Sequence, residues 1–206
     1  MRTSDTYKTI TKPSKETLFK EKHSKFFSYA FPIKNEEDVK IALESLRKQH
    51  SSAGHFCYAY QIGTQTDKIK YRANDDGEPN NSAGMPIYGQ IQSYAVTNIL
   101  IVVVRYFGGV KLGVGGLISA YRTGAQMALD GSNIKTKTIN VLYLISFEYK
   151  NMNKVMRIIK EKNLNIVDQK LELDCKITIS VRQKEASKVE TSFNSIYEVS
   201  VKELED

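Results

Sequence analysis

Short apolar runs alternate with helix-spaced apolar positions in the last third of the chain. Residues 141–149 are rich in β-branched and aromatic side chains, which is typical of a strand. Asn151 is expected to cap a following helix. The further predicted elements are the rest of that helix (Met152, Val155, Met156, Ile159), strands over 165–173 and 175–181, a helix (Ala186, Val189, Phe193, Ile196) and a strand over 197–201. The order βαββαβ predicts a ferredoxin-like sheet with two helices on one face.

The pattern before residue 138 is more mixed, and it predicts strands and helices in an α+β arrangement. The first predicted elements are two or three antiparallel strands within 5–33, a helix capped by Asn35 and a strand over 56–62. A polar loop over 73–84 follows, and its Ser82 is expected to cap a helix around 87–94. After that come a buried strand over 99–104, a glycine-rich turn and a helix whose inward face is Leu117, Tyr121, Gly124, Ala125 and Ala128.

Glycine divides the chain into two predicted domains. Ten of the twelve glycines fall between Gly77 and Gly131, and none follows Gly131. A polar stretch comes directly after that glycine. We therefore expect one domain over 1–132 and a second over 138–206.

Composition is that of an ordinary folded protein, with 41% hydrophobic and 26% charged residues. The longest apolar run, 99–104, is far shorter than the roughly 20 residues that cross a bilayer. The N-terminal segment shows no hydrophobic signal region, so a cytoplasmic location without membrane contact is expected. The two cysteines, Cys57 and Cys175, fall in different predicted domains and are expected to be reduced. No metal-ligand spacing occurs, so neither a metal nor a cofactor is predicted.

Charge is distributed unevenly along the chain. Residues 1–137 hold 19 Lys and Arg against 12 Asp and Glu, whereas residues 138–206 hold 11 of each. The entire net charge of +7 therefore belongs to residues 1–137. Such an excess is compatible with nucleic acid or an acidic partner, and equally with a merely basic surface.

A glycine-rich segment, 105–116, lies between a predicted strand and a predicted helix. A helix start exposes unpaired N–H groups and partial positive charge, and glycines let a ligand approach the main chain. We expect an anion or phosphate cradle there, formed by Arg105, Lys111, Gly113, Gly115 and Gly116. Neither the Walker A nor the dinucleotide-binding glycine pattern is complete. The alternative is that the glycines serve only tight turns and close packing.

Two further segments could line a cleft beside that loop. Asp75, Asp76 and Glu78 could bind Mg²⁺ or act as acid and base, or the segment could be a structural turn. A carboxylate there could also neutralise Arg105. His55 and Cys57 share one face of a strand, which raises a nucleophile hypothesis, although residues two apart on a strand are poorly placed for direct activation.

These three segments, together with Ser24-Lys25-Phe26, resemble the signature of the IMPACT/YigZ family in its bacterial, two-domain form. The resemblance implies a first domain like domain 2 of ribosomal protein S5 and a second like the ferredoxin-like C-terminal domain of elongation factor G. It implies a role connected with translation, since eukaryotic relatives modulate translation through a protein partner. Asn80, Asn81, Ser82 and Met85 depart from the family's usual residues. Met85 stands where arginine is common, and the loss of that arginine weakens anion binding beside the acidic turn.

These observations favour a translation-related regulator that binds RNA, the ribosome or an acidic protein partner through its first domain. They favour a binding protein over an enzyme without deciding between them. One alternative is an enzyme acting on a phosphorylated small molecule between the two loops, with Asp76 or Glu78 as base or metal ligand. Another is a protein-interaction scaffold that binds no nucleic acid. The oligomeric state is not indicated.

Overall fold

The structure is a computed structural model that describes residues 5–64 and 69–204. The chain forms two compact units. One lies within Tyr7–Lys137, and the other comprises residues 138–204 together with Asp5 and Thr6. No helix in the described ranges is long and apolar enough to span a bilayer.

The first unit is built on a five-stranded antiparallel sheet. Its order is β2 (Thr17–Glu21), β3 (Ser24–Pro32), β6 (Ile99–Tyr106), β4 (His55–Ile62) and β5 (Lys70–Asn74). β6 is the central strand and is buried from Ile99 to Arg105, which explains its continuous apolar sequence.

The strands in this part of the chain differ from the sequence expectation both in their pairing and in their number. β1 (Thr6–Ile10) does not join β2 and β3 but pairs with β7 (Ile134–Thr138). β5 and β7 were not predicted as strands, because only Ala73 and Asn74 of β5 and only Ile134 of β7 are even partly buried.

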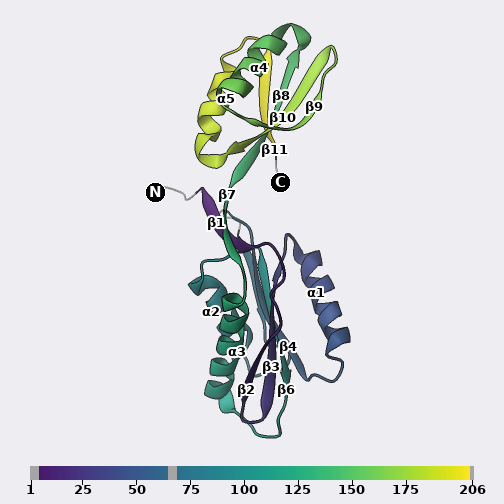
Figure 1. The fold of residues 1–206 in the computed structure, drawn as a ribbon, viewed down its shortest axis with the longest axis vertical. Coiled ribbons are helices and arrows are strands. Elements are labelled where there is room, and N and C mark those ends of the chain that lie inside the picture. The colour runs from purple at the N-terminus through teal and green to yellow at the C-terminus, as the bar shows by residue number, and fades with distance from the viewer. Residues whose placement is uncertain (1–4, 65–68, 205–206) are drawn as a thin grey trace. The chain divides into compact units, whose positions relative to one another are not determined.

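Helices cover both faces of the five-stranded sheet (Figure 1). α1 (Glu36–Gln49) packs on one face, and α2 (Gly84–Ser93) and α3 (Gly113–Asp130) pack on the other. Side-chain alternation along β6 supplies both cores, since Leu100, Val102 and Val104 face α1 while Ile99, Ile101 and Val103 face α2 and α3.

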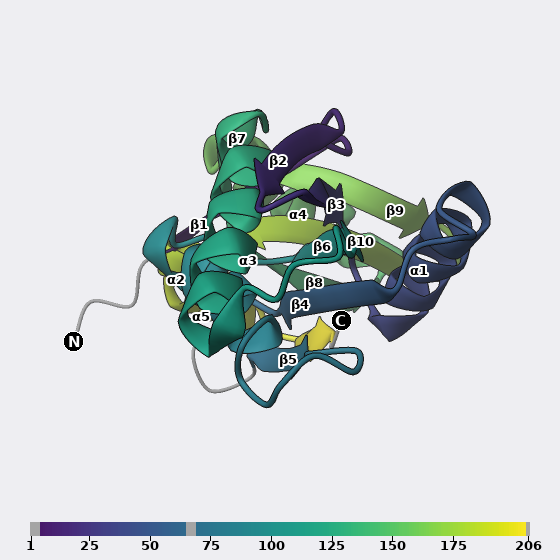
Figure 2. The ribbon, with the colours of Figure 1, turned by 90° about the horizontal axis from the view of Figure 1, so that it is seen from below.

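Several chain segments meet at one end of this sheet, which we call the loop end (Figure 2). β3 and β4 begin there and β5 and β6 finish there, as the pairs Lys25–Tyr106, His55–Arg105 and Tyr58–Asn74 show. α2 and α3 also begin there, because Gly84 lies against Asn74 and the segment leading to α3 lies against His23. The three segments of chemical interest are therefore brought together by topology.

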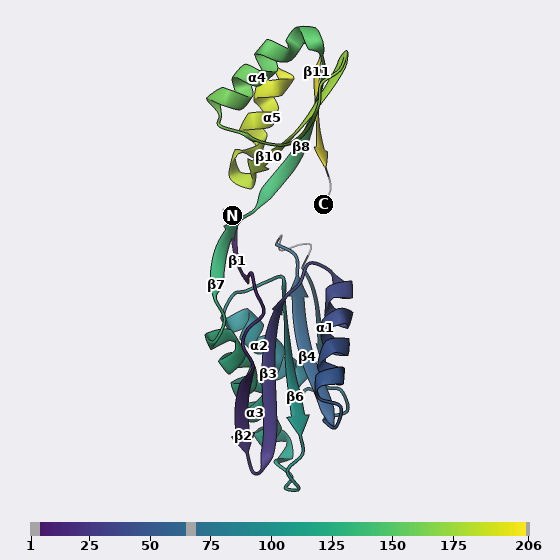
Figure 3. The ribbon, with the colours of Figure 1, turned by 45° about the vertical axis from the view of Figure 1, so that its right-hand side comes forward.

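The second unit shows the predicted order of elements, with α4 and α5 on one face of its sheet (Figure 3). The strand order is β11–β8–β10–β9. The elements are β8 (Asn140–Glu148), a 3₁₀ turn (Tyr149–Asn151), α4 (Met152–Glu161), β9 (Asn165–Lys170), β10 (Asp174–Arg182), a second 3₁₀ turn (Gln183–Glu185), α5 (Ala186–Asn194) and β11 (Val199–Leu204).

Of the three predicted helix caps, one is confirmed and two are wrong. Asn35 accepts from the Asp38 amide and forms a capping box at α1. Asn151 precedes α4, but its amide nitrogen donates to the Tyr197 carbonyl instead of its oxygen capping the helix. Ser82 does not cap α2 either, because its hydroxyl donates to the Pro79 carbonyl at 2.6 Å. Short polar side chains take whichever backbone partner the local turn places nearest.

Candidate functional site

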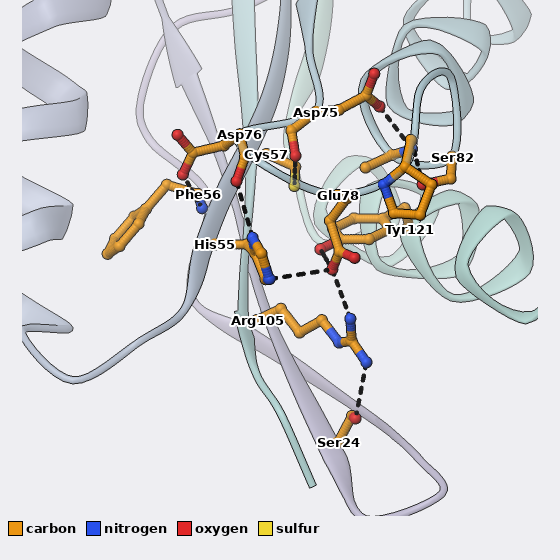
Figure 4. A network of polar contacts seen from close by, with 12 residues as sticks. Ser24, His55, Phe56, Cys57, Asp75, Asp76, Glu78, Ser82, Arg105 and Tyr121 are labelled. Atoms are coloured by element: carbon orange, nitrogen blue, oxygen red, sulfur yellow. Dashed lines mark hydrogen bonds and ion pairs between the residues drawn. The ribbon is translucent and has the colours of Figure 1, made fainter. Parts of the chain in front are cut away.

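A buried ion pair forms the centre of the loop end (Figure 4). Arg105 donates from Nη1 to Glu78 Oε1 at 2.6 Å, and the two residues are 5% and 9% exposed. The Tyr121 hydroxyl donates to the same oxygen at 2.7 Å. Glu78 lies in the turn before α2, Arg105 at the end of β6 and Tyr121 on α3, so three separate segments are tied together by one carboxylate.

The surroundings of Arg105 hold its guanidinium in place. Nη2 lies 3.3 Å from Ser24 Oγ, which also accepts from the Gly108 amide at 3.2 Å. The guanidinium carbon lies 5.5 Å from the ring centres of both Phe26 and Phe107, within cation–π range. Nε is buried and has no partner within the described residues. Arg105 thus links the first residue of β3 to the acidic turn.

Asp75 serves as the cap of α2. Its Oδ1 accepts from the amides of Ala83 and Gly84 at 2.9 and 2.8 Å, and its Oδ2 accepts from Asn81 at 2.9 Å. These amides surround the start of α2, where unpaired N–H groups and the positive end of the helix dipole favour a carboxylate. Asp75, eight residues before Ala83, therefore provides the helix cap that Ser82 was predicted to provide.

Asp76 ties the acidic turn to β4 and α1. Its Oδ2 accepts from the Phe56 amide at 2.6 Å, and its Oδ1 lies 3.3 Å from Arg47. His55 Nδ1 lies 2.8 Å from the Asp76 carbonyl, and since a carbonyl only accepts, Nδ1 carries the proton. The other ring nitrogen of His55, Nε2, lies 3.9 Å from Glu78 Oε1.

Cys57 is buried beneath the same turn and donates from Sγ to the Asp75 carbonyl at 3.0 Å. Burial raises the pKa of this thiol far above its usual range, as burial also raises the pKa of Tyr121. A nucleophilic cysteine needs a lowered pKa and an adjacent base. Because the structure supplies neither, the geometry of Cys57 gives the nucleophile hypothesis no support.

The glycine-rich loop is largely exposed, in contrast to the buried residues around the acidic turn. Gly113, Gly115 and Lys111 are exposed and Gly116 is partly exposed. The residue before α3 is the apolar Leu112, which makes no side-chain cap, and Gly113 has φ of +74°, a conformation that favours glycine. No side chain in the described part of the chain accepts from the first-turn amides of α3. This helix start is therefore open to solvent.

The structure separates the residues predicted to bind an anion into two groups. Lys111 and the three glycines lie at the open start of α3. Arg105 is buried, and its Nη donors are already engaged by Glu78 and Ser24. The arginine therefore lies behind the surface that a large anion would meet, because the carboxylate of Glu78 holds it in the interior.

The β2–β3 hairpin adds a feature that the pattern did not reveal. Lys20 and Lys25 are directly opposite each other across the strands. Lys22 occupies the turn beside the start of α3, where it lines a groove of about 200 Å³ with Glu21, Leu112 and Gly116. Among the residues that the structure describes, these lysines and Lys111 form no ion pair.

The hairpin turn itself is strained. Lys22 and His23 have φ of 43° and 66°, which costs L-residues roughly 1 kcal/mol or more each. A two-residue turn of this kind usually has Asn-Gly at these positions. Lysine is therefore presented at the turn tip despite an unfavourable backbone conformation.

Ser24 and Tyr121 are site residues whose roles the sequence does not indicate. Ser24 stands out only as part of a motif and Tyr121 only as a core residue of its helix, because nothing in their spacing indicates Arg105 or Glu78 as their partners.

Comparisons with known proteins agree on one family. The model of the Impact N-terminal domain matches residues 22–129. An IMPACT family member of Haemophilus influenzae is 30% identical over 84% of each chain, and the Escherichia coli member YigZ is 33% identical over 71% of this chain and 72% of its own. A solved structure of a hypothetical protein matches 98% of this chain and 99% of its own, with a TM-score of 0.74 and 25% identity.

Proposed function

This chain belongs to the IMPACT family, and we propose that it is a translation-related regulator that binds RNA, alone or on the ribosome, through the loop end of its first unit. The observation that carries the proposal is the open, glycine-lined start of α3 beside Lys22 and Lys111. The link to translation rests on the family resemblance, and the choice of RNA rests on the surface.

Electrostatics supports a polyanionic ligand. The unpaired lysines of the hairpin and the loop lie at the end where the helix start exposes positive partial charge. Phosphate groups accept hydrogen bonds from main-chain amides at a helix start and from lysine side chains. The basic excess of the whole chain lies in this unit, so the long-range field attracts the same ligand.

The buried network supports a binding surface over a catalytic centre. The carboxylates of Asp75 and Asp76 are hydrogen-bonded to backbone amides, and that of Glu78 is paired with Arg105. Side chains engaged in this way hold the loop end in one shape. We assign the acidic turn to that structural role and the lysines and the α3 start to ligand contact.

For the fold, we propose the finer classes that the resemblance implies. The order β11–β8–β10–β9 with two helices on one face supports a ferredoxin-like second unit similar to the C-terminal domain of elongation factor G. The first unit would be similar to domain 2 of ribosomal protein S5.

A titration of fluorescently labelled RNA at several salt concentrations tests the function. The expected result is binding that weakens steeply with salt. A Lys22→Ala, Lys111→Ala variant should bind more weakly, and its salt slope should be shallower by about 1 for each phosphate that the removed lysines neutralise. The matched control is Lys154→Ala, Lys160→Ala, which removes two exposed lysines of the neutral unit.

Three outcomes would contradict the proposal: undetectable binding, binding without salt dependence, or an equal decrease in affinity for the test and control variants. Capture of a protein partner that persists after RNase treatment, with no RNA bound, would instead indicate an interaction scaffold.

A further inference from the structure

Phe107 is an exposed aromatic side chain at the start of the glycine-rich loop. It is 56% exposed, although it directly follows the buried strand β6. Exposing an apolar ring to water is unfavourable, so a partner that covers the Phe107 ring would gain the free energy of burying it. The valines of the same loop and helix start, Val110 and Val114, are also exposed, at 44% and 53%.

Phe107 and the residue after it contact the buried network and the β2–β3 hairpin. The Arg105 guanidinium lies 5.5 Å from its centre and is itself fixed by Glu78 and Ser24. The next residue, Gly108, lies so close to the hairpin that an added Cβ would be 2.1 Å from the His23 carbonyl carbon. Its amide donates to Ser24 Oγ. The backbone directly after Phe107 is therefore held against the hairpin, and the ring lies near a guanidinium that is itself fixed by hydrogen bonds.

The surroundings of this ring are cationic. Lys111 follows four residues later, His23 of the hairpin turn packs against Gly108, and Lys22 lines a groove at the open start of α3. Glu21 lines the same groove, but the hairpin and the loop carry four lysines, Lys20, Lys22, Lys25 and Lys111, against this one carboxylate. Aromatic rings beside a positively charged groove bind single-stranded nucleic acid, because each unpaired base can stack on the ring while its phosphate meets the cations. A base inside a duplex has both faces covered by its neighbours and cannot stack in this way.

We propose that Phe107 is a stacking platform for an unpaired base and that the chain consequently prefers single-stranded RNA to duplex RNA. This inference rests on the proposed function, since it names the form of RNA that the same surface takes. The ring provides base stacking, and the lysines and main-chain amides bind the phosphates.

The test compares one RNA strand, alone and annealed to its complement, at a single salt concentration. Phe107→Leu is expected to weaken binding of the single strand by about tenfold, which is the size of effect that removing one base–aromatic stack produces. Duplex binding and the salt slope should stay unchanged because the cations remain. Tyr149→Leu is the matched control, since Tyr149 is 63% exposed but lies in the neutral unit.

A second variant reports the stacking directly. The chain has no tryptophan, so Phe107→Trp introduces a single indole whose fluorescence can be excited separately from that of the tyrosines. Its fluorescence is expected to be quenched by the single strand and not by the duplex, and Tyr149→Trp should be quenched by neither.

The outcomes separate this inference from the function on which it rests. If neither RNA form binds the parent protein, the proposed function fails. If both forms bind with salt dependence, but Phe107→Leu weakens neither or both equally, or Phe107→Trp is not quenched, the stacking platform is overturned and polyanion binding stands.

Discussion

Two helices of the first unit begin at the same end of the same sheet, and their first turns are treated in opposite ways. At α2, the Asp75 carboxylate accepts from three backbone amides. At α3, the preceding residue is Leu112 and three of the first four residues are glycine. Both helix starts present the same positive partial charge. The amides of the α2 start are hydrogen-bonded by a carboxylate of the chain itself, whereas those of the α3 start have no side-chain partner among the described residues.

The α2 start is also the more deeply anchored of the two. The turn that precedes it carries Glu78, whose ion pair with Arg105 is almost completely buried. A buried pair of this kind adds little net stability by itself, but removing one partner leaves an uncompensated charge. Substitutions that break the α2 start and substitutions that close the α3 start should therefore have different effects.

The largest effect is expected for Glu78→Gln. The substitution leaves the buried Arg105 without a counter-charge, which costs about 3 kcal/mol or more in the free energy of unfolding. Urea denaturation measures the decrease. Glu37→Gln is the matched control, because its ion pair with Lys40 is exposed, and losing that pair together with a first-turn carboxylate of α1 should cost about 1 kcal/mol at most. Equal midpoints for both variants would show that Arg105 does not depend on Glu78.

Asp75→Ala should have the next largest effect. It removes the acceptor of three amides at α2 and should lower the free energy of unfolding by about 2 kcal/mol. Because the Cys57 thiol donates to the Asp75 carbonyl, loosening this turn should also speed labelling of Cys57 by a thiol reagent. The labelling is compared with and without Asp75→Ala in a Cys175→Ser background. Slow labelling and an unchanged urea midpoint would argue against capping by Asp75.

The smallest effect, and the sharpest contrast, is expected for Gly115→Glu at α3. An added Cβ at this exposed position meets no atom within 4 Å. Replacing a helical glycine and placing a carboxylate in the first turn should together stabilise the chain by about 1 kcal/mol. The same carboxylate should weaken RNA binding several-fold.

The matched substitution is Gly115→Gln, which gains helix propensity without charge. It should therefore be stabilised slightly less and keep its RNA affinity. Stability comes from urea denaturation and affinity from the RNA titration. Identical RNA affinity for the Glu and Gln variants would show that the α3 start does not meet the ligand.

Much of the secondary structure could be predicted because it depends on local periodicity. The apolar run of β6, the inward face of α3 and the order of elements in the second unit all follow from patterns within short windows. The Asn35 cap could be predicted for the same reason, since its partner Asp38 is three residues away. The apolar pattern did not predict β5 because the side chains of this strand are mostly exposed.

The composition of the loop end can be listed from the order of residues alone: a glycine-rich helix start, three carboxylates and a basic excess. Which of these charges meet depends on the fold. Arg105 and Glu78 are 27 residues apart and Tyr121 is 43 residues from Glu78, so their shared oxygen depends on how β6 and α3 are placed around the turn. Burial then assigns the roles, because desolvation forces Arg105 to pair inside the chain while Lys111 stays in water.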